Sequence, residues 1–319
     1  MEPMSPIGGY FDLELPRFDV PHADGLMLSS GRACIEVVLR HRRPALVHVP
    51  RYTCDVVVEP MARLGIEVAF YPVSANLRPD PLPAVGDGEM LVVNNYFGLQ
   101  DDHGASLAQR LGDRLIVDCS QAFHAPPVGH GAFSFYTPRK FCGVADGGIL
   151  VGDGLSYPDL PRDVSWQRSS HLLRRIDEGA RAGYATFQQN DASLTGQPAM
   201  RMSHLTHRLL HACDHHRARL RRRANFAMLH EALGARNAFV PPSLDAFACP
   251  MVYPFRSPDP ALRARLIEAG IFVATYWPNV RAWCPPDSVE YRLTEELLPL
   301  PIDQRYGEGD MHRILAVLA

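Results

Sequence analysis

The amino-acid sequence predicts an α/β fold with a mainly parallel sheet. In the first half of the 319-residue chain, short apolar runs typical of buried strands alternate with segments of helical periodicity. This alternation is typical of parallel strands joined by helices that cover both faces of a sheet. Polar residues follow several of the apolar runs. Because ligands of open α/β sheets bind beyond the carboxyl ends of the strands, we expect a site there.

Local signals justify the elements of the first half. Residues 31–42 predict a helix with Ser30 as its N-cap, and residues 53–64 predict a second helix, weakened by Pro60 and ended by Gly65. The other expected elements are a short helix at 105–112 and strands at 45–50, 67–73, 90–97, 115–121, 132–136 and 147–152. The polar segment that follows, 155–200, has no clear pattern and is expected to be an irregular connecting or active-site segment.

The end of the chain predicts a smaller α/β unit. A long helical stretch rich in Arg and His at 201–235 precedes it, so we expect one domain over 1–235 and a second over 236–319. The elements expected in the second domain are strands at 248–256 and 271–277, a helix at 260–270 and a short helix near 309–318.

Composition excludes several classes of protein. No apolar run approaches the roughly 18 residues of a membrane-spanning helix, and the start of the chain has no apolar core of a secretory signal. A net charge of −3 argues against a general nucleic-acid binder. The seven cysteines form no CxxC pair, which argues against a disulfide framework and a zinc site. We therefore expect a cytoplasmic protein with reduced thiols.

The lysine count bears directly on chemistry. Lys and Arg together number 32, and Lys140 is the one lysine among them. Replacement of lysine by arginine in a GC-rich genome explains such a number as well as function does. Arginine, however, cannot replace lysine as an amine nucleophile, because the guanidinium stays protonated and forms no Schiff base. The sequence around Lys140 therefore decides between the two interpretations.

The segment 115–148 contains the chemistry that such a lysine needs. A buried strand ends near Asp118, and a carboxylate at that place is costly to bury without a partner. A pyridinium nitrogen would be such a partner, Lys140 would form the Schiff base, and Ser134 and Thr137 offer hydroxyls for a phosphate. Pyridoxal phosphate (PLP) enzymes require this set of groups. The alternative is an ordinary strand-end aspartate and a surface lysine.

Nine segments, in order along most of the chain, resemble the DegT/StrS family of PLP-dependent sugar aminotransferases. They are IGGYFDLEL (7–15), LSSGRACIEVVL (28–39), VPRYTCDVVVEPMARLGIEVAFYPV (49–73), NNYFG (94–98), VDCSQAF (117–123), FSFYTPRKF with the following DGG (133–148), MRMSHLTHRLL (200–210), RLIEAGIFVATYWP (265–278) and LLPLPIDQRY (297–306). The resemblance implies aspartate-aminotransferase fold type I: a mainly parallel, seven-stranded sheet between helices, and a small C-terminal α/β domain.

The resemblance also implies roles for individual residues toward PLP. Lys140 is the Schiff-base lysine that also moves the proton, Asp118 binds the pyridine nitrogen, and Gln121 contacts the phenolic oxygen of the ring. The phosphate is expected at the backbone N–H groups of Gly31 and Arg32, at the start of a helix. Ser134 and Thr137 are rival phosphate hydroxyls, because the run from Ser to Lys is longer than the family's usual spacing.

Three positions depart from the family pattern. Arg32 stands where the phosphate turn usually has Thr or Ser, although Arg can itself bind a phosphate. Cys54 takes the place of the residue, often aromatic, that stacks on the ring, so Tyr52 or Phe97 could stack instead. Ala199 and Met200 replace an Asn-Tyr pair whose Asn usually reaches the neighbouring subunit's phosphate.

The predicted function is a PLP-dependent aminotransferase that moves an amino group from an amino acid, glutamate in the family, to a keto sugar. The sugar is expected to be nucleotide-linked, in surface polysaccharide or secondary-metabolite biosynthesis. A homodimer is expected, because relatives of this fold build the site between two subunits. Two alternatives stay open: a PLP enzyme of another reaction type, such as a dehydratase or a non-sugar transaminase, and a non-catalytic relative that binds a small molecule.

Two further patterns lie in the helical stretch before the second domain. His204, His207, His211 and His215 share helical spacing, but no carboxylate or cysteine completes a metal site, and no metal is predicted. The basic run at 217–223 is interpreted as a solvated helix face, with contact to a substrate diphosphate as the alternative.

Overall fold

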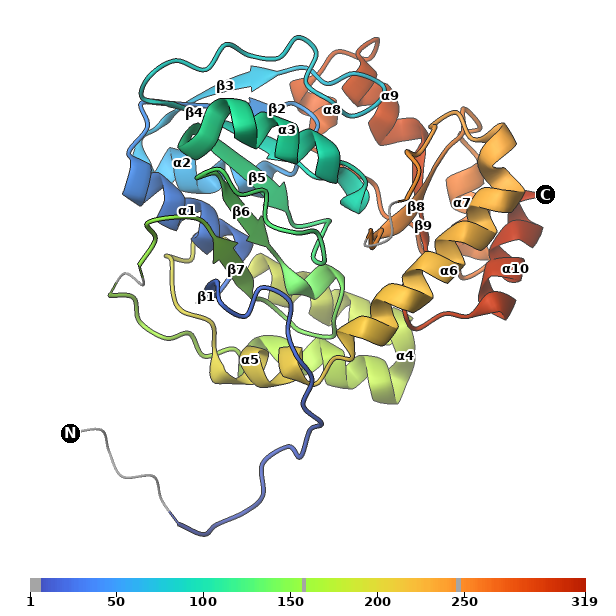
Figure 1. Ribbon diagram of the computed structural model, residues 1–319. Helices are drawn as coiled ribbons and strands as arrows, with labels where there is room; N and C mark the ends of the chain where they lie inside the picture. Colours follow the sequence, from blue (N-terminus) through green and yellow to red (C-terminus); the bar gives the residue numbers. More distant parts are fainter. Residues whose placement is uncertain (1–6, 157–158, 245–247) are drawn as a thin grey trace.

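A seven-stranded sheet forms the centre of the molecule (Figure 1). The computed structural model describes residues 7–156, 159–244 and 248–319. The strand order is β1-β7-β6-β5-β4-β2-β3, and only β7 runs against its neighbours. The strands are β1 (Leu26–Leu28), β2 (Leu46–Pro50), β3 (Glu67–Tyr71), β4 (Glu89–Asn94), β5 (Leu115–Cys119), β6 (Phe133–Tyr136) and β7 (Gly148–Val151). The predicted mainly parallel sheet is confirmed.

Helices cover both faces of this sheet, and each face has its own apolar core. On β5, Ile116 belongs to the core under α1 (Gly31–Arg42) and α2 (Glu59–Leu64), whereas Leu115 and Val117 belong to the other. The second core includes residues of α3 (Asp101–Leu111). Because side chains alternate along a strand, a central strand with apolar residues at successive positions is buried on both faces.

A smaller unit built on two antiparallel strands, β8 (Val252–Arg256) and β9 (Leu297–Pro301), packs beside the large sheet (Figure 1). The long helix α6 (His215–Leu233) contacts both β8 and the C-terminal helix α10 (Glu308–Leu318). The other helices of this unit are α7 (Leu262–Glu268), α8 (Val280–Trp283) and α9 (Val289–Glu296). The domain boundary near residue 235 stays a prediction.

The segment expected to be irregular, 155–200, contains a long helix, so that expectation is wrong. Helix α4 (Ser170–Ala192) reverses at Gly179, whose φ is 84°, and Gly183 then packs against the backbone of Arg175. The reversal interrupts the helical periodicity, and several of the helix's large apolar side chains face solvent. Both properties hide the helix from a search for one buried apolar stripe.

The small sheet also differs from the expectation. Residues 271–277 form no strand, and β9 pairs with β8 instead. The side chains of Ile271 and Val273 are buried and that of Phe272 is exposed, so the segment alternates like a strand without a ladder partner. β9 contains Pro299 and Pro301, and because proline weakens a strand assignment the sequence signal there was poor.

Two expected helices are divided. The stretch 201–235 forms α5 (His204–His211) and α6, with Asp214 accepting from the amide of Arg217 as the N-cap of α6. The helix expected at 53–64 begins as a 3-10 turn at Asp55–Val57 and continues as α2, with Pro60 in its first turn. Within the described residues, no helix is both long and apolar enough to cross a membrane.

Gly148, at the start of β7, is a position where a larger side chain is expected to destabilise the fold. A Cβ there would lie 2.4 Å from the carbonyl oxygen of Ser30 and 2.6 Å from Sγ of Cys34, so β7 touches the start of α1. We expect Gly148→Ala to lower the free energy of unfolding by about 1–3 kcal/mol in denaturant titrations. Gly309→Ala in α10 is the matched control, because nothing lies within 4 Å of its Cβ. Equal midpoints for the two variants would contradict this contact.

Candidate active site

Two neighbouring strands bring Asp118 and Lys140 together. Asp118 lies on β5, and Lys140 ends a 3-10 turn that directly follows β6. Nζ of Lys140 donates a hydrogen bond to Oγ of Ser120 at 3.2 Å, and the amide of Ser120 donates to Oδ1 of Asp118 at 2.7 Å. Ser120 therefore links the amine and the carboxylate that the sequence predicted to act together.

Burial changes the acid-base properties of both groups. Burial raises the pKa of Asp118, while the charge of Lys140 and the hydrogen bonds from Ser120 lower it. Burial lowers the pKa of Lys140, and the charge of Asp118 opposes this. The amine of Lys140 is therefore neutral, and able to act as a nucleophile, at a lower pH than an ordinary lysine. Shifted pKa values of this kind cluster at functional sites.

Two amide side chains next to this pair leave buried atoms without partners. Gln121 accepts a hydrogen bond from the amide of Phe97 at 3.1 Å, but its Nε2 has no partner among the described residues. Asn94 donates to Oγ1 of Thr53 at 2.9 Å, and its buried Oδ1 is likewise unpartnered within the part of the chain that the structure describes. Because buried polar atoms are rarely left unpaired, both atoms point to a bound polar molecule.

The sequence indicates Asn94 only as a polar residue at the end of a strand, with no role toward a ligand. The available signal was its position as the last residue of a buried strand, β4, beside Asp118 in the register of the parallel sheet. Polar residues at the carboxyl ends of adjacent parallel strands meet at one edge of the sheet.

The first turn of α1 provides backbone donors for an anion. The amides of Gly31 and Arg32 precede the first N–H that can bond inside the helix, and Oγ of Ser30 accepts from the amide of Ala33 at 3.2 Å. A Cβ on Gly31 would lie 2.8 Å from Cγ2 of Thr137. Only glycine therefore fits between the helix start and Thr137, and the Thr137 side chain lies at this end of the helix.

The two rival hydroxyls are separated in the structure. Oγ of Ser134 accepts from the amide of Val128 at 3.4 Å. The next residue, Phe135, faces Gly31, and side chains alternate along a strand, so Ser134 points to the opposite face of the sheet. The side chain of Thr137 lies at the helix start with its methyl group toward Gly31, and its Oγ1 donates to the carbonyl of Ser120 at 3.3 Å.

The side chain of Arg32 already has a partner. Its Nε donates to Oε2 of Glu59 on α2 at 2.6 Å, and the Arg32 side chain is only 9% exposed. This ion pair fixes the guanidinium between α1 and α2. An anion at the start of α1 would therefore meet the backbone of Arg32 rather than its charge.

Cys54 is the one of the three ring-stacking candidates that keeps exposed surface. It is half-buried, just before the 3-10 turn at Asp55–Val57. Burial raises the pKa of its thiol, and the charge of Lys140 opposes this. Tyr52 and Phe97 have no exposed surface. The ring of Tyr52 packs against Trp277, with 5.0 Å between the ring centroids. Neither aromatic residue can face a ligand without repacking.

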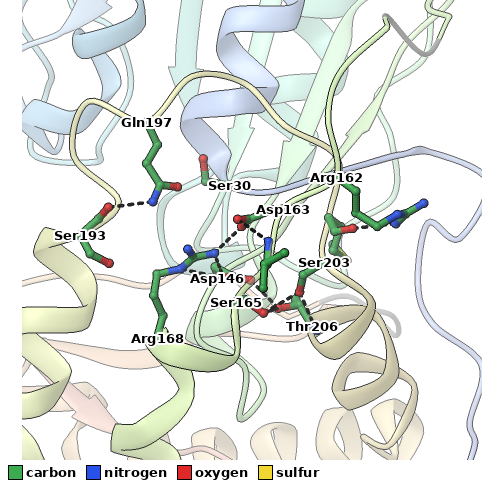
Figure 2. Close-up of polar contacts among 12 residues, drawn as sticks. Ser30, Asp146, Arg162, Asp163, Ser165, Arg168, Ser193, Gln197, Ser203 and Thr206 are labelled. Atoms are coloured by element: carbon green, nitrogen blue, oxygen red, sulfur yellow. Dashed lines mark hydrogen bonds and ion pairs between the residues drawn. The ribbon is translucent and has the colours of Figure 1, made fainter.

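A buried network fixes the segment that follows Lys140 (Figure 2). Nη2 of Arg168 lies 2.7 Å from Oδ2 of Asp146 and also pairs with Asp163, while Thr206 donates to Oδ1 of Asp146. Asp146 is only 1% exposed. The next residue, Gly147, donates from its amide to the carbonyl of Ser29 at 2.8 Å. The network therefore ties the lysine segment to α5 and to the start of α1.

A cavity of about 210 Å³ opens beside Lys140. Its walls come from α6, from the small sheet and from the segment before α8, and they are lined by Lys140, Arg222, Met251, Val252, Phe272, Ala274, Tyr276, Pro299, Pro301 and Asp303. Lys140 therefore lines a pocket between the large sheet and the small unit.

The histidines of α5 and α6 do not converge on one point. The rings of His207 and His211 lie 4.6 Å apart, whereas Nε2 of His215 bonds the carbonyl of Leu210 at 3.0 Å. Among the described residues, no group of three His, Cys, Asp or Glu side chains is arranged to hold a metal ion. The basic run at 217–223 is not wholly solvated, because Arg222 is buried.

Comparisons with known proteins agree with this architecture. No protein-family model matches the chain, and no curated protein sequence does. Among solved structures, the sugar aminotransferase CalS13 from Micromonospora echinospora aligns with a TM-score of 0.60 and 17% identity, over 92% of this chain and 86% of that one. The aminotransferase TlmJ from Streptoalloteichus hindustanus gives a TM-score of 0.63 and 18% identity, over 92% and 84%.

A third similar structure was solved in a PLP form. The PLP form of Spr1654 from Streptococcus pneumoniae aligns with a TM-score of 0.61 and 15% identity, over 92% of this chain and 85% of that chain. At these identities the likeness establishes the fold. The chain has the fold of these enzymes, as the sequence resemblance implied.

The Asp146 network predicts a pH-dependent loss of stability. In Arg168→Met, Asp146 and Asp163 stay buried without their cation, so we expect the free energy of unfolding to fall by about 3–5 kcal/mol at neutral pH. Burial already raises the pKa of Asp146, and loss of Arg168 raises it further. The folded variant then binds more protons than the unfolded chain, so its stability falls as the pH rises.

Denaturant titrations of Arg168→Met between pH 5 and pH 8 measure this effect. Arg174→Met is the matched control, since Arg174 forms an exposed ion pair with Glu178 in α4 and should change little. A deficit for Arg168→Met that is independent of pH would contradict the role assigned to the buried carboxylate.

Proposed function

We propose that this protein is a PLP-dependent aminotransferase that moves an amino group from an amino acid to a keto sugar. The observation that carries the proposal is the link from Lys140 through Ser120 to the buried Asp118. Lys140 is the single lysine of the chain, and its burial favours the neutral amine. The fold shared with CalS13, a sugar aminotransferase by name, supports the same conclusion.

The residues present fit PLP. Lys140 would hold the aldehyde carbon and Asp118 the ring nitrogen. The unpartnered Nε2 of Gln121 would donate to the ring hydroxyl oxygen. The amides at the start of α1 would bind the phosphate, and the hydroxyl of Thr137 would join them by exchanging its hydrogen bond to the carbonyl of Ser120. When bound, PLP supplies an electron-withdrawing ring that stabilises negative charge on a carbon losing a proton.

The protein's own groups then carry the acid-base work. Asp118 would hold the ring nitrogen in its protonated form, because a buried carboxylate is best compensated by a positive partner. Nζ of Lys140, with its lowered pKa, accepts the proton that leaves the α-carbon of the donor. Ser120 holds the amine from a distance of 3.2 Å. Half-buried Cys54 lies near the same amine and would face the ring without an aromatic stack.

We propose glutamate as the donor, a nucleotide-linked keto sugar as the acceptor, and the cytoplasm as the location. The names of the compared structures support the sugar acceptor. All seven cysteines are free, which is consistent with a reducing compartment.

Trapping of the cofactor tests the proposed chemistry. Borohydride reduction after incubation with PLP should attach the cofactor to Lys140, and peptide mass spectrometry distinguishes this label from one on the terminal amine. Lys140→Arg keeps the positive charge but has no nucleophilic amine, so it should carry no label there. Lys140→Ala should slow the half-reaction with glutamate by at least about 100-fold. An unlabelled Lys140, or full activity in Lys140→Ala, would refute the proposal.

The same preparation tests the acceptor. The aminated enzyme is mixed with nucleotide-linked keto sugars and with simple keto acids, and recovery of the PLP absorbance is followed. Recovery with at least one keto sugar, faster than with every simple keto acid, is the expected result. Recovery with keto acids alone would assign the enzyme to a non-sugar transamination.

We further propose that a second copy of this chain covers its exposed apolar surface. Residues 7–18 form an arm that is bonded to α5 through Asp12 and Phe18 (Figure 1), and the side chains of Ile7, Tyr10 and Phe11 are at least 90% exposed. On α4, Ile176 is 80% exposed and Tyr184 is 59% exposed. Exposed apolar groups of this extent are typical of interaction surfaces.

Light scattering tests the dimer. We expect twice the chain mass of 35.5 kDa for the wild type, and a shift toward the monomer for Ile176→Glu. Leu220→Glu is the matched control, because Leu220 is an exposed leucine on α6, at 52% exposure. A monomeric wild type at working concentration would overturn the prediction.

A further inference from the structure

The cavity beside Lys140 contains a second cation, Arg222. This residue comes from α6, is 1% exposed, and lines the cavity together with Lys140. Arginine is almost never fully buried unless its charge is paired. The position of Arg222 therefore needs an explanation that a solvated helix face does not provide.

Neutral groups fix the guanidinium of Arg222. Its Nη1 donates to the carbonyl of Met251 at 2.8 Å, its Nε donates to Oε1 of Gln304 at 3.1 Å, and its Cζ lies 4.6 Å from the ring centroid of Phe141. Gln304 is itself held by a hydrogen bond of 2.6 Å to the carbonyl of Phe141. The guanidinium is thus held rigidly at the cavity wall, next to the segment that carries Lys140.

No carboxylate within the described residues forms an ion pair with Arg222. The acid that lines the same cavity, Asp303, accepts from Nε of Arg305 at 2.7 Å and from Nη2 of Arg305 at 2.8 Å. Asp303 therefore already compensates another arginine. Burial lowers the pKa of Arg222, and the nearby charge of Asp303 offsets only part of this.

The cavity wall therefore carries a buried positive charge at Arg222 that an anion would compensate. A buried charge without a counter-ion is costly, and an anionic ligand that enters the cavity would remove that cost. The remaining walls are largely apolar, with Phe272, Val252 and the prolines of β9. Because low-dielectric walls strengthen a charge-assisted hydrogen bond, one guanidinium can hold one carboxylate firmly here.

We propose that Arg222 binds a carboxylate of the amino-acid donor and so directs the donor's amine toward Lys140. The inference rests on the proposed aminotransferase function and names the residue that selects the donor class. A single buried guanidinium matches a single carboxylate. The diphosphate of a sugar nucleotide is the competing anion, and it would require further cations around the same cavity.

The experiment uses the PLP-loaded enzyme and four amine donors. Glutamate carries two carboxylates, alanine only the α-carboxylate, 4-aminobutyrate only a distal one, and n-butylamine none. Stopped-flow absorbance gives the rate constant of the half-reaction with each donor. In Arg222→Gln, the preference for carboxylate-bearing donors over n-butylamine should fall about 10- to 100-fold, as expected for loss of a charged hydrogen bond. The contrast between alanine and 4-aminobutyrate shows which carboxylate is bound.

Two matched variants accompany this measurement. Arg221→Gln removes an exposed arginine at the preceding position of α6 and should leave every donor unchanged. Arg222→Lys keeps the positive charge without the fork of donors and should retain part of the preference. Equal losses for all four donors would show a purely structural role and overturn the proposal. A defect confined to the sugar-nucleotide half-reaction would overturn it in favour of the diphosphate.

A measurement on the wild type keeps the test decisive if Arg222→Gln does not fold. Succinate, which has carboxylates but no amine, should inhibit the reaction with n-butylamine competitively. Absence of inhibition would overturn the role of Arg222. Absence of the PLP label on Lys140 in the wild type would instead refute the proposed function, so the two failures are distinguishable.

Discussion

The candidate site depends on one electrostatic constraint: a carboxylate and an amine share a buried edge of the sheet. Burial alone would push both Asp118 and Lys140 toward their neutral forms. Each charge partly rescues the other, and Ser120 bonds to both of them. An aromatic cation that enters between them would take over the role of partner to Asp118. Lys140 would then be released as a neutral amine, which is the form that a nucleophile requires.

The rest of the large domain can be understood as the support for this pair. Parallel pairing of β5 with β6 places the ends of the two strands side by side, which sets the separation of Asp118 from the turn that carries Lys140. β7 must approach α1 so closely that only Gly148 fits, and Gly147 bonds to Ser29 just before the same helix. The lysine segment and the start of α1 are therefore fixed to each other by backbone contacts.

The sequence predicted the parts of the fold that repeat regularly. Strong apolar runs and the capped helix at 31–42 were predictable, and so was the meeting of Asp118 with Lys140, because strand ends of a parallel sheet share an edge. Helix α4 was not predictable, since Gly179 breaks its period and its apolar side chains are exposed. For the segment 271–277 the sequence predicted a strand that the structure does not contain. Its alternating pattern indicates which side chains are buried, but it does not show whether another strand pairs with the segment.

The sequence could not predict those details of the site that depend on the direction in which a side chain points. The separation of Ser134 from Thr137 depends on the side of the sheet to which each side chain points, and spacing to Lys140 does not encode that side. The partner of Arg32, Glu59, lies on another helix. The unpartnered Nε2 of Gln121 becomes visible only when its surroundings are known.

The contrast between the single lysine and the many arginines acquires a physical meaning in this cavity. Lys140 loses its proton more readily when buried, and that property makes it useful as a nucleophile. Arg222, in the same cavity, keeps its charge despite burial, because a guanidinium is not deprotonated in proteins. One wall thus offers an amine that can be neutral, and another offers a cation that cannot. An amino acid presents the complementary pair of groups, an amine that must react and a carboxylate that must only be held.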